Sequence, residues 1–188
     1  MEITVRDAIT VVHGMLFGGL LLLCFSGAAV SLKQLGGTSL PSGLASHRAL
    51  TRYLWAMAIL AWAAVLLGAY AVYPWYRALP PPGIQDLAGY PQRLLLATPL
   101  TAGWHNLGME WKEHIAWFAP ITLTAAAALV GRYGPHLRNL SALRQAVWGL
   151  LIAGFACAAV AGFFGAMLNK YAPVHGGNEV VLLHAGVK

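Results

Sequence analysis

Charged residues are scarce in this sequence of 188 residues, and acidic residues are the scarcest. Asp, Glu, Lys and Arg make up only 10% of the chain, whereas an ordinary soluble domain is about 25% charged. This low charge excludes a disordered chain and a coiled coil, which both depend on charged residues. Two cysteines are too few for a disulfide-rich scaffold. Hydrophobic residues make up 59% of the chain, which indicates an integral membrane protein.

Four long intervals of the sequence contain no charged residue: 8–32, 53–76, 114–131 and 145–169. Each is close to the ~20 apolar residues that a helix needs to cross a bilayer, and each is too long for a strand of a membrane barrel. We therefore predict membrane-spanning helices over residues 5–32, 51–77, 107–132 and 142–170. The stretch 92–98 (QRLLLAT) is expected to form either a short helix along the interface or a packed loop.

The distribution of charge between the helices predicts the topology. The loops 33–50 and 133–141 and the residues that flank them carry six basic residues and no acidic one: Lys33, Arg48, Arg52, Arg132, Arg138 and Arg144. By the positive-inside rule these two loops are cytoplasmic, and the loop 78–106 and the tail 171–188 face outward. Nucleic acid is not an expected partner, because these basic residues are the usual anchors beside a bilayer.

The sequence therefore predicts one all-α membrane domain over residues 1–188. We expect an antiparallel, up-down bundle of four transmembrane helices with both termini on the outer or periplasmic side. The membrane is expected to be a bacterial-type inner (plasma) membrane, with the lipid bilayer as the surroundings of the apolar helices.

Two of the seven histidines lie inside predicted helices, where an ionisable side chain is costly and indicates function. Thr4 and Asp7 have the spacing of a capping box for the first helix, and Asn106 is expected to cap the third. Counted from these caps, His13 and His114 lie about 12–13 Å along their helices, at nearly the same level. In an up-down bundle these helices are diagonal, so both imidazoles can meet a flat cofactor from opposite faces.

Small and aromatic residues accompany the two histidines at this level, together with basic residues at the outer surface. The residues expected to bind a cofactor are His13, His114, Gly14, Gly18, Gly162, Gly165, Phe163, Phe164 and Arg93. Two imidazoles are suitable axial ligands for an electron-transferring haem, and an arginine is a suitable partner for its propionates. We predict one haem b with His13 and His114 as ligands of the iron, and with Glu110 as the acceptor for the free ring N–H of His114.

Four transmembrane helices with histidines on the first and third are similar to the four-helix b-type cytochromes that anchor redox enzymes in membranes. The resemblance is architectural and covers the four helices. It implies electron transfer between quinol in the bilayer and an outward-facing membrane or periplasmic redox partner. It also implies a quinone as a further cofactor.

Two other functions stay open. His105 and Glu110, with His13, Glu113 and His114 nearby, would suit Zn or Cu without a porphyrin. The chain is alternatively a cofactor-free structural subunit of a larger membrane complex, in which the small residues only pack. The motifs of nucleotide-binding loops, nucleophile elbows and HExxH metal sites are missing from the sequence. We therefore expect an electron-transfer or structural subunit rather than an enzyme on its own.

Overall fold

The computed structural model of the protein describes residues 3–36, 46–174 and 179–180. These residues are almost entirely helical. Four helices are long and apolar enough to cross a membrane, and we call them the first to fourth long helices: Val5–Leu35, His47–Tyr76, Pro99–His136 and Ser141–Tyr171. The prediction of a nearly all-helical chain with four helices able to span a bilayer is confirmed.

The first three long helices are built from consecutive segments, and only the fourth is a single α-helix. The first consists of α1 (Val5–Val11), η1 (Val12–Gly19) and α2 (Leu20–Gly36). The second consists of α3 (His47–Leu67), η3 (Gly68–Val72) and α4 (Tyr73–Tyr76). The third consists of α6 (Pro99–Glu110), η4 (Trp111–Ile115), α7 (Phe118–Tyr133) and the short turn η5 (Gly134–His136). The fourth is α8 (Ser141–Tyr171), and a short helix α5 (Pro91–Leu96) precedes the third.

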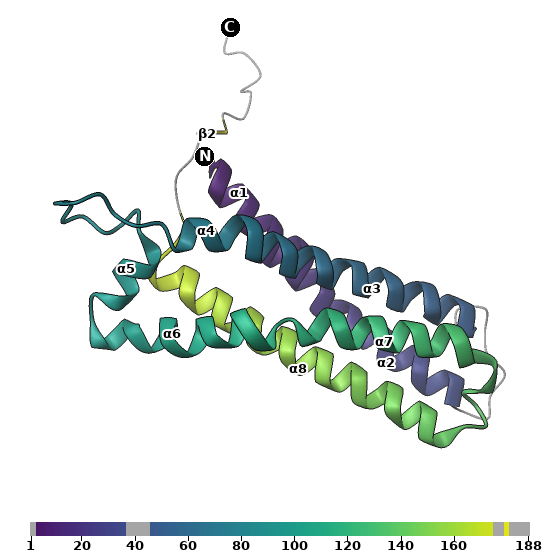
Figure 1. The fold of residues 1–188 in the computed structure, drawn as a ribbon. Helices are drawn as coiled ribbons and strands as arrows, with labels where there is room; N and C mark the ends of the chain where they lie inside the picture. Colours follow the sequence, from purple (N-terminus) through teal and green to yellow (C-terminus); the bar gives the residue numbers. More distant parts are fainter. Residues whose placement is uncertain (1–2, 37–45, 175–178, 181–188) are drawn as a thin grey trace, which may run out of the picture.

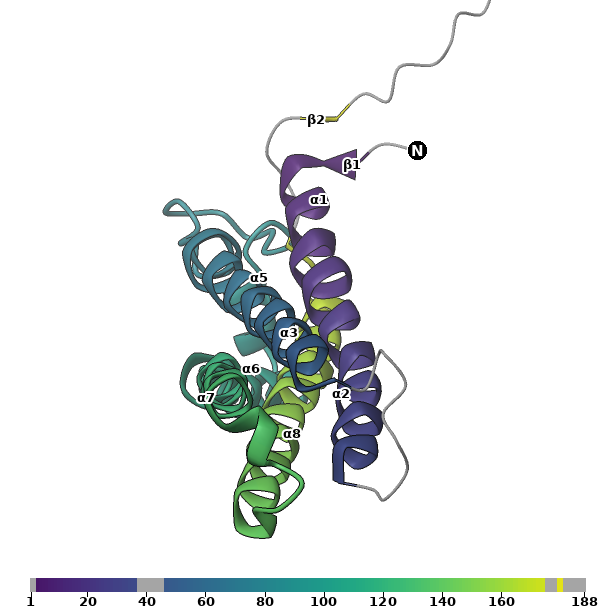
Figure 2. The same ribbon diagram turned by 90° about the vertical axis from the view of Figure 1, so that its right-hand side faces the viewer.

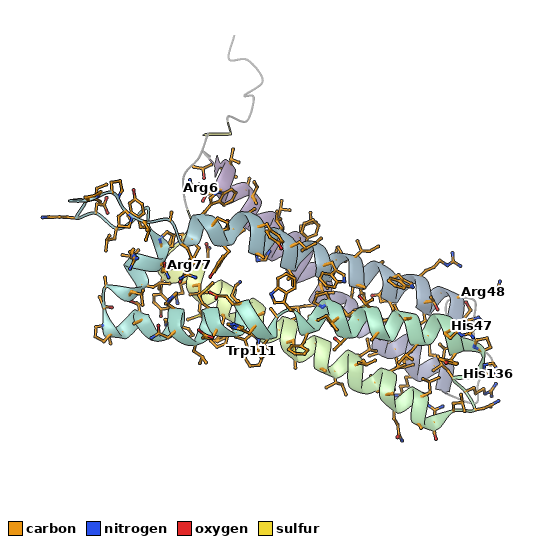
Figure 3. The ribbon with its side chains drawn as sticks, viewed as in Figure 1. Arg6, His47, Arg48, Arg77, Trp111 and His136 are labelled. Carbon is orange, nitrogen blue, oxygen red and sulfur yellow. The ribbon has the colours of Figure 1, made fainter. Side chains whose placement is uncertain are left out.

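The long helices lie side by side and form an elongated bundle (Figures 1 and 2). α7 packs against both α3 and α8, and the first long helix contacts α3 and α8. The labelled side chains in Figure 3 mark two opposite ends of the bundle. We call the end with His47, Arg48 and His136 the His136 end, and the end with Arg6 and Arg77 the Arg77 end.

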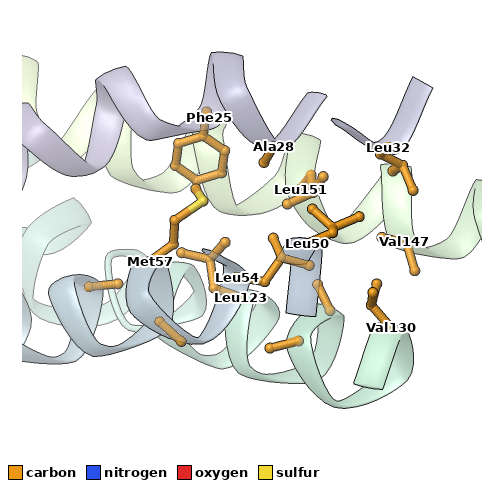
Figure 4. Packing of buried hydrophobic residues seen from close by; sticks show 14 of the residues in the cluster. Phe25, Ala28, Leu32, Leu50, Leu54, Met57, Leu123, Val130, Val147 and Leu151 are labelled. Carbon is orange, nitrogen blue, oxygen red and sulfur yellow. The ribbon is translucent and has the colours of Figure 1, made fainter. Parts of the chain in front are cut away.

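The half of the bundle toward the His136 end is filled by one cluster of buried apolar side chains (Figure 4). All four long helices contribute to it, and Leu32, Leu54, Leu123 and Val130 are fully buried. Lipid is as apolar as leucine, so close packing rather than water exclusion holds membrane helices together. We call this group the apolar cluster.

A second, smaller group of buried side chains lies at the Arg77 end. α5 contributes Leu95, which is fully buried, and it joins Tyr76, Met109 and Leu168. Of the two alternatives for residues 92–98, the structure has the short helix. α5 therefore closes this end of the bundle against α6, with which it is in contact.

The two predicted helix caps have different outcomes. Thr4 and Asp7 form the predicted capping box at the start of α1. Asn106, in contrast, lies inside α6, because the third long helix begins at Pro99 rather than near residue 107. Proline is favourable at the first turn of a helix, where its missing N–H has no partner to lose, so Pro99 starts this helix rather than interrupting it.

The two ends of the described chain meet in a short antiparallel pair of strands at the Arg77 end. β1 (Ile3–Thr4) pairs with β2 (Glu179–Val180), with Ile3 opposite Val180 and Thr4 opposite Glu179. Most of the predicted tail 171–188 and part of the predicted loop 33–50 lie outside the described residues.

Candidate functional site: a polar level toward the Arg77 end

Three of the four long helices widen into π-helix, and these segments are η1, η3 and η4. π-helical turns are rare and are often found at functional sites. The segments contain His13, Gly68 and Lys112, respectively. Two of the three π-helical segments therefore contain an ionisable side chain, and the third begins with a glycine.

His13 and Lys112 lie at a similar depth in the bundle. Each is 20 residues along its helix from a basic residue toward the His136 end, namely Lys33 and Arg132, respectively. At ~1.5 Å per residue this separation is about 30 Å, the thickness of a hydrocarbon core. The long helices have 30–38 residues, so they are longer than the hydrocarbon core is thick.

His13 is turned toward the second long helix. A Cβ atom added to Gly68 would lie 2.7 Å from Cε1 of His13, so the ring occupies the space that a side chain at position 68 would need. His13 Nδ1 is buried without a hydrogen-bond partner among the described residues, and so is Oγ1 of Thr10 one turn earlier. Buried polar atoms nearly always have partners, so these two atoms mark a place where a polar partner is expected.

Lys112 is turned toward the fourth long helix. A Cβ atom added to Gly165 would lie 2.9 Å from Nζ of Lys112. The positive charge of Lys112 is close enough to act on the imidazole of His13. All four long helices therefore contribute to one place in the bundle, and we call His13, Gly68, Lys112 and Gly165 the His13–Lys112 site.

His114, the second predicted haem ligand, lies in different surroundings. Its side chain is 67% exposed, and Nδ1 lies 3.3 Å from Oε2 of Glu110 and 3.1 Å from the Glu110 carbonyl oxygen. This is the contact with Glu110 that the spacing predicted. His13 is half-buried against Gly68, whereas His114 is exposed. Haem ligation by the pair stays an untested prediction.

The predicted small residues differ in their surroundings. Gly14 has nothing within 4 Å of an added Cβ, and Gly18 has only a carbonyl of its own helix at 3.5 Å. At Gly162 the only neighbour is Leu22, at 3.7 Å. Gly165 is the one predicted glycine of the four that lies against a polar side chain.

The predicted aromatic residues form part of a larger aromatic group. Phe163 and Phe164 have ring centroids 6.0 Å and 6.4 Å, respectively, from that of Trp104. Phe164 also packs against Gly108, where an added Cβ would lie 3.1 Å from its ring. Arg93 is exposed on α5. Phe163 and Phe164 therefore pack α8 against α6.

A second group of polar residues lies nearer the Arg77 end and is centred on His105. The Tyr76 hydroxyl lies 2.6 Å from Nδ1 of His105, and the two rings stack with centroids 5.8 Å apart. On the other side of the ring, Nε2 lies 3.5 Å from Nε2 of Gln92, which is buried in α5. Three segments of the chain thus hold the imidazole of His105 in place.

Arg77 and Glu113 complete this second group through Tyr73. Arg77 donates a hydrogen bond to the Tyr73 hydroxyl, and the carboxyl of Glu113 lies close enough to that hydroxyl to act on it electrostatically. The hydrogen bond to Tyr73 raises the pKa of Arg77 above its ordinary value, so the guanidinium is charged. A cavity of about 400 Å³ adjoins the group and is lined by Arg77, His105, Asn106, Met109, Glu110 and Glu113. We call these lining residues the Arg77–His105 site.

His105 and Glu110, the residues proposed for Zn or Cu, both line this cavity. A metal site of this kind needs a group of at least three His, Cys, Asp or Glu side chains. Residues 3–36, 46–174 and 179–180 contain no such group. The described residues therefore do not support the Zn or Cu alternative.

Comparison with protein families, curated proteins and solved structures finds no match for the chain. The function therefore has to be inferred from the geometry of the two polar groups.

The spacing of the sequence carries a signal for the inward position of Lys112. Gly108 is buried against Phe164, and Lys112 lies four residues further on the same face of the helix. Glu110 and His114 share the other face, and both are exposed. The roles of Tyr76 and Gln92, in contrast, depend on contacts between distant segments that spacing does not reveal.

Proposed function

We propose that the protein is a quinone-binding subunit of a membrane redox complex, with the quinone headgroup in the Arg77–His105 site. The observation that carries the proposal is the hydrogen-bonded pair of Tyr76 and His105 beside the cavity of about 400 Å³ that also contains Arg77 and Glu113. Asn106 and Glu110 on the cavity wall are exposed, so a ligand can reach it from the surface of the bundle.

The side chains of the site match both forms of a quinone. A quinone carbonyl needs hydrogen-bond donors, which the Arg77 guanidinium and the Asn106 amide supply. Quinol hydroxyls need acceptors, and the carboxylates of Glu110 and Glu113 are the acceptors in the site. Oxidation of a quinol to a quinone releases two protons and two electrons. The protons pass to Glu110 and Glu113, and the electrons pass to a redox centre of a partner subunit.

The depth of the site supports this proposal. If the basic residues toward the His136 end are cytoplasmic, as the positive-inside rule predicts, the Arg77–His105 site lies at and just beyond the outer edge of the hydrocarbon core. A quinone whose tail stays in the bilayer places its headgroup at this depth. The proposed topology therefore has the Arg77 end and both termini on the outer side of a bacterial-type inner membrane.

Haem b receives less support from the geometry than quinone does, because His13 and His114 lie in different surroundings. A reduced-minus-oxidised absorption spectrum of the purified protein tests for it directly. A b-type spectrum that disappears in His13→Ala would establish haem binding next to the quinone site. A protein that binds neither haem nor quinone would be the structural subunit considered above.

Quinone binding is tested by titrating the protein in nanodiscs with a short-chain quinone and following tryptophan fluorescence. We expect saturable binding that is weakened by roughly 5-fold in His105→Ala, because His105 holds Tyr76 and Gln92 in the wall of the site and an uncharged hydrogen bond contributes about 1 kcal/mol. The matched control is His47→Ala, since His47 lines a different cavity at the His136 end. Non-saturable binding, or equal loss in both variants, would overturn the proposal.

A further inference from the structure

The His13–Lys112 site is separate from the proposed quinone site and has a composition of its own. Its polar groups are the Lys112 ammonium and the His13 imidazole, with the buried hydroxyl of Thr10 one turn from His13. The ammonium and the hydroxyl are hydrogen-bond donors, and Nδ1 of His13 is buried without a hydrogen-bond partner among the described residues. Lys112 donates no hydrogen bond to any side chain in the described part of the chain.

The two acidic residues nearest to Lys112 in the sequence are engaged elsewhere. Glu110 pairs with His114 on the exposed face of the helix, and Glu113 lines the cavity of the Arg77–His105 site. Lys112 therefore has no carboxylate ion-pair partner among the residues that the structure describes. A cation in a membrane helix is costly unless an opposite charge compensates it.

The backbone at the site leaves room for these polar groups. Glycines stand where a side chain would meet His13, at Gly68, and where one would meet Lys112, at Gly165. The π-helical segments η1, η3 and η4 run through the same level of the bundle. All four long helices thus contribute to one place in the bundle. This place contains hydrogen-bond donors and two glycines, and the charge of Lys112 is not compensated there by a carboxylate of the described residues.

We propose that the His13–Lys112 site binds an oxyanion, namely the phosphate group of an anionic phospholipid. The depth of the site favours this source, because Lys112 and His13 lie about 30 Å from the basic residues of the other end. This separation places them at the phosphate level of the opposite leaflet. Phosphate oxygens accept several hydrogen bonds and supply the negative charge that Lys112 lacks.

The test is thermal unfolding of the delipidated protein in a neutral detergent, with three additions. These are a short-chain phosphatidylglycerol, a diacylglycerol with the same chains but no phosphate, and inorganic phosphate alone. We expect phosphatidylglycerol at about 100-fold excess over its Kd to raise the Tm by roughly 5–10 °C. Diacylglycerol should leave the Tm nearly unchanged. An equal rise with inorganic phosphate would confirm an oxyanion site and identify a free anion as the source.

Substitutions assign the effect to the site. Lys112→Gln should abolish the rise in Tm, whereas the control Lys170→Gln should keep it, because Lys170 is an exposed lysine at the same end. If Lys112→Gln does not fold, Lys112→Met provides the second test, since it keeps an unbranched side chain of similar length and removes the charge. A rise that survives in Lys112→Gln or in Lys112→Met, or equal rises with phosphatidylglycerol and diacylglycerol, would overturn the proposal. Quinone titration of Lys112→Gln should match wild type, which separates this site from the proposed quinone site.

Discussion

The two halves of the bundle are built on different principles. Toward the His136 end, regular α-helices enclose an apolar cluster whose fully packed members are all hydrophobic. Toward the Arg77 end, three helices become π-helical, and buried polar atoms of Thr10 and His13 lack hydrogen-bond partners among the described residues. Unsatisfied polar atoms and irregular helices cost stability, and proteins retain them mainly where function needs them. The comparison therefore assigns stability to the apolar half and function to the polar half.

The largest effect on stability is expected from a cavity in the apolar half. Leu123→Ala removes a fully buried side chain, and we expect the free energy of unfolding to fall by about 2–5 kcal/mol. Unfolding in mixed micelles measures the change. Leu66→Ala is the control, because Leu66 is 42% exposed. A loss in Leu66→Ala as large as that in Leu123→Ala would contradict the role of the apolar cluster.

A smaller loss is expected from crowding in the polar half. Gly68→Ala places a methyl group 2.7 Å from Cε1 of His13, which should reduce the free energy of unfolding by about 1–3 kcal/mol. The loss should largely disappear when His13→Ala is also present, as a double-mutant cycle would show. Gly149→Ala is the control, because nothing lies within 4 Å of its added Cβ. An unchanged loss in the His13→Ala background would show that the ring of His13 is not the cause.

Quinone affinity should respond to Tyr76 with little change in stability. Tyr76→Phe removes the hydroxyl that holds His105, a change of about 1 kcal/mol. We therefore expect quinone binding to weaken roughly 5-fold. The control is Tyr70→Phe, since Tyr70 is 77% exposed. If both variants bind quinone like wild type, Tyr76 does not position His105 for binding.

Single cysteines at exposed loop positions test which half of the bundle faces the cytoplasm. Of the proposed substitutions, these are expected to change the stability of the protein least. In a variant without Cys24 and Cys157, a cysteine at Gln85 should react with an impermeant thiol reagent in intact cells. A cysteine at Asn139 should be protected until the cells are opened. Surface substitutions of this kind change stability by less than about 0.5 kcal/mol. Reaction at Asn139 and protection at Gln85 would reverse the proposed topology.

The apolar half was largely predictable from the sequence, and the polar half was not. Uncharged intervals of sufficient length are enough to identify the four helices, and the Thr4–Asp7 pair identifies the start of the first one. The sequence predicts a third helix from residue 107, whereas the structure has it begin at Pro99, because proline is favourable in the first helical turn.

The candidate sites depended on information that sequence spacing does not carry. An estimate from helix rise alone placed His13 and His114 at one level but did not show which way each side chain faces. Lys112, on the opposite helix face from His114, is the residue that meets Gly165. Likewise, the Tyr76–His105–Gln92 contacts join three segments, and their pairing is set by how α4, α5 and α6 pack at the Arg77 end.

The central proposal, a quinone site in the polar half, is tested most directly by photolabelling. A photoreactive quinone is bound to the protein in nanodiscs, cross-linked by light and located by mass spectrometry of the peptides. We predict labels within residues 73–77 and 105–113 that an excess of unlabelled quinone removes. Labels confined to the cavity at the His136 end, which His47 and Arg138 line, or labels that excess quinone does not displace, would contradict it.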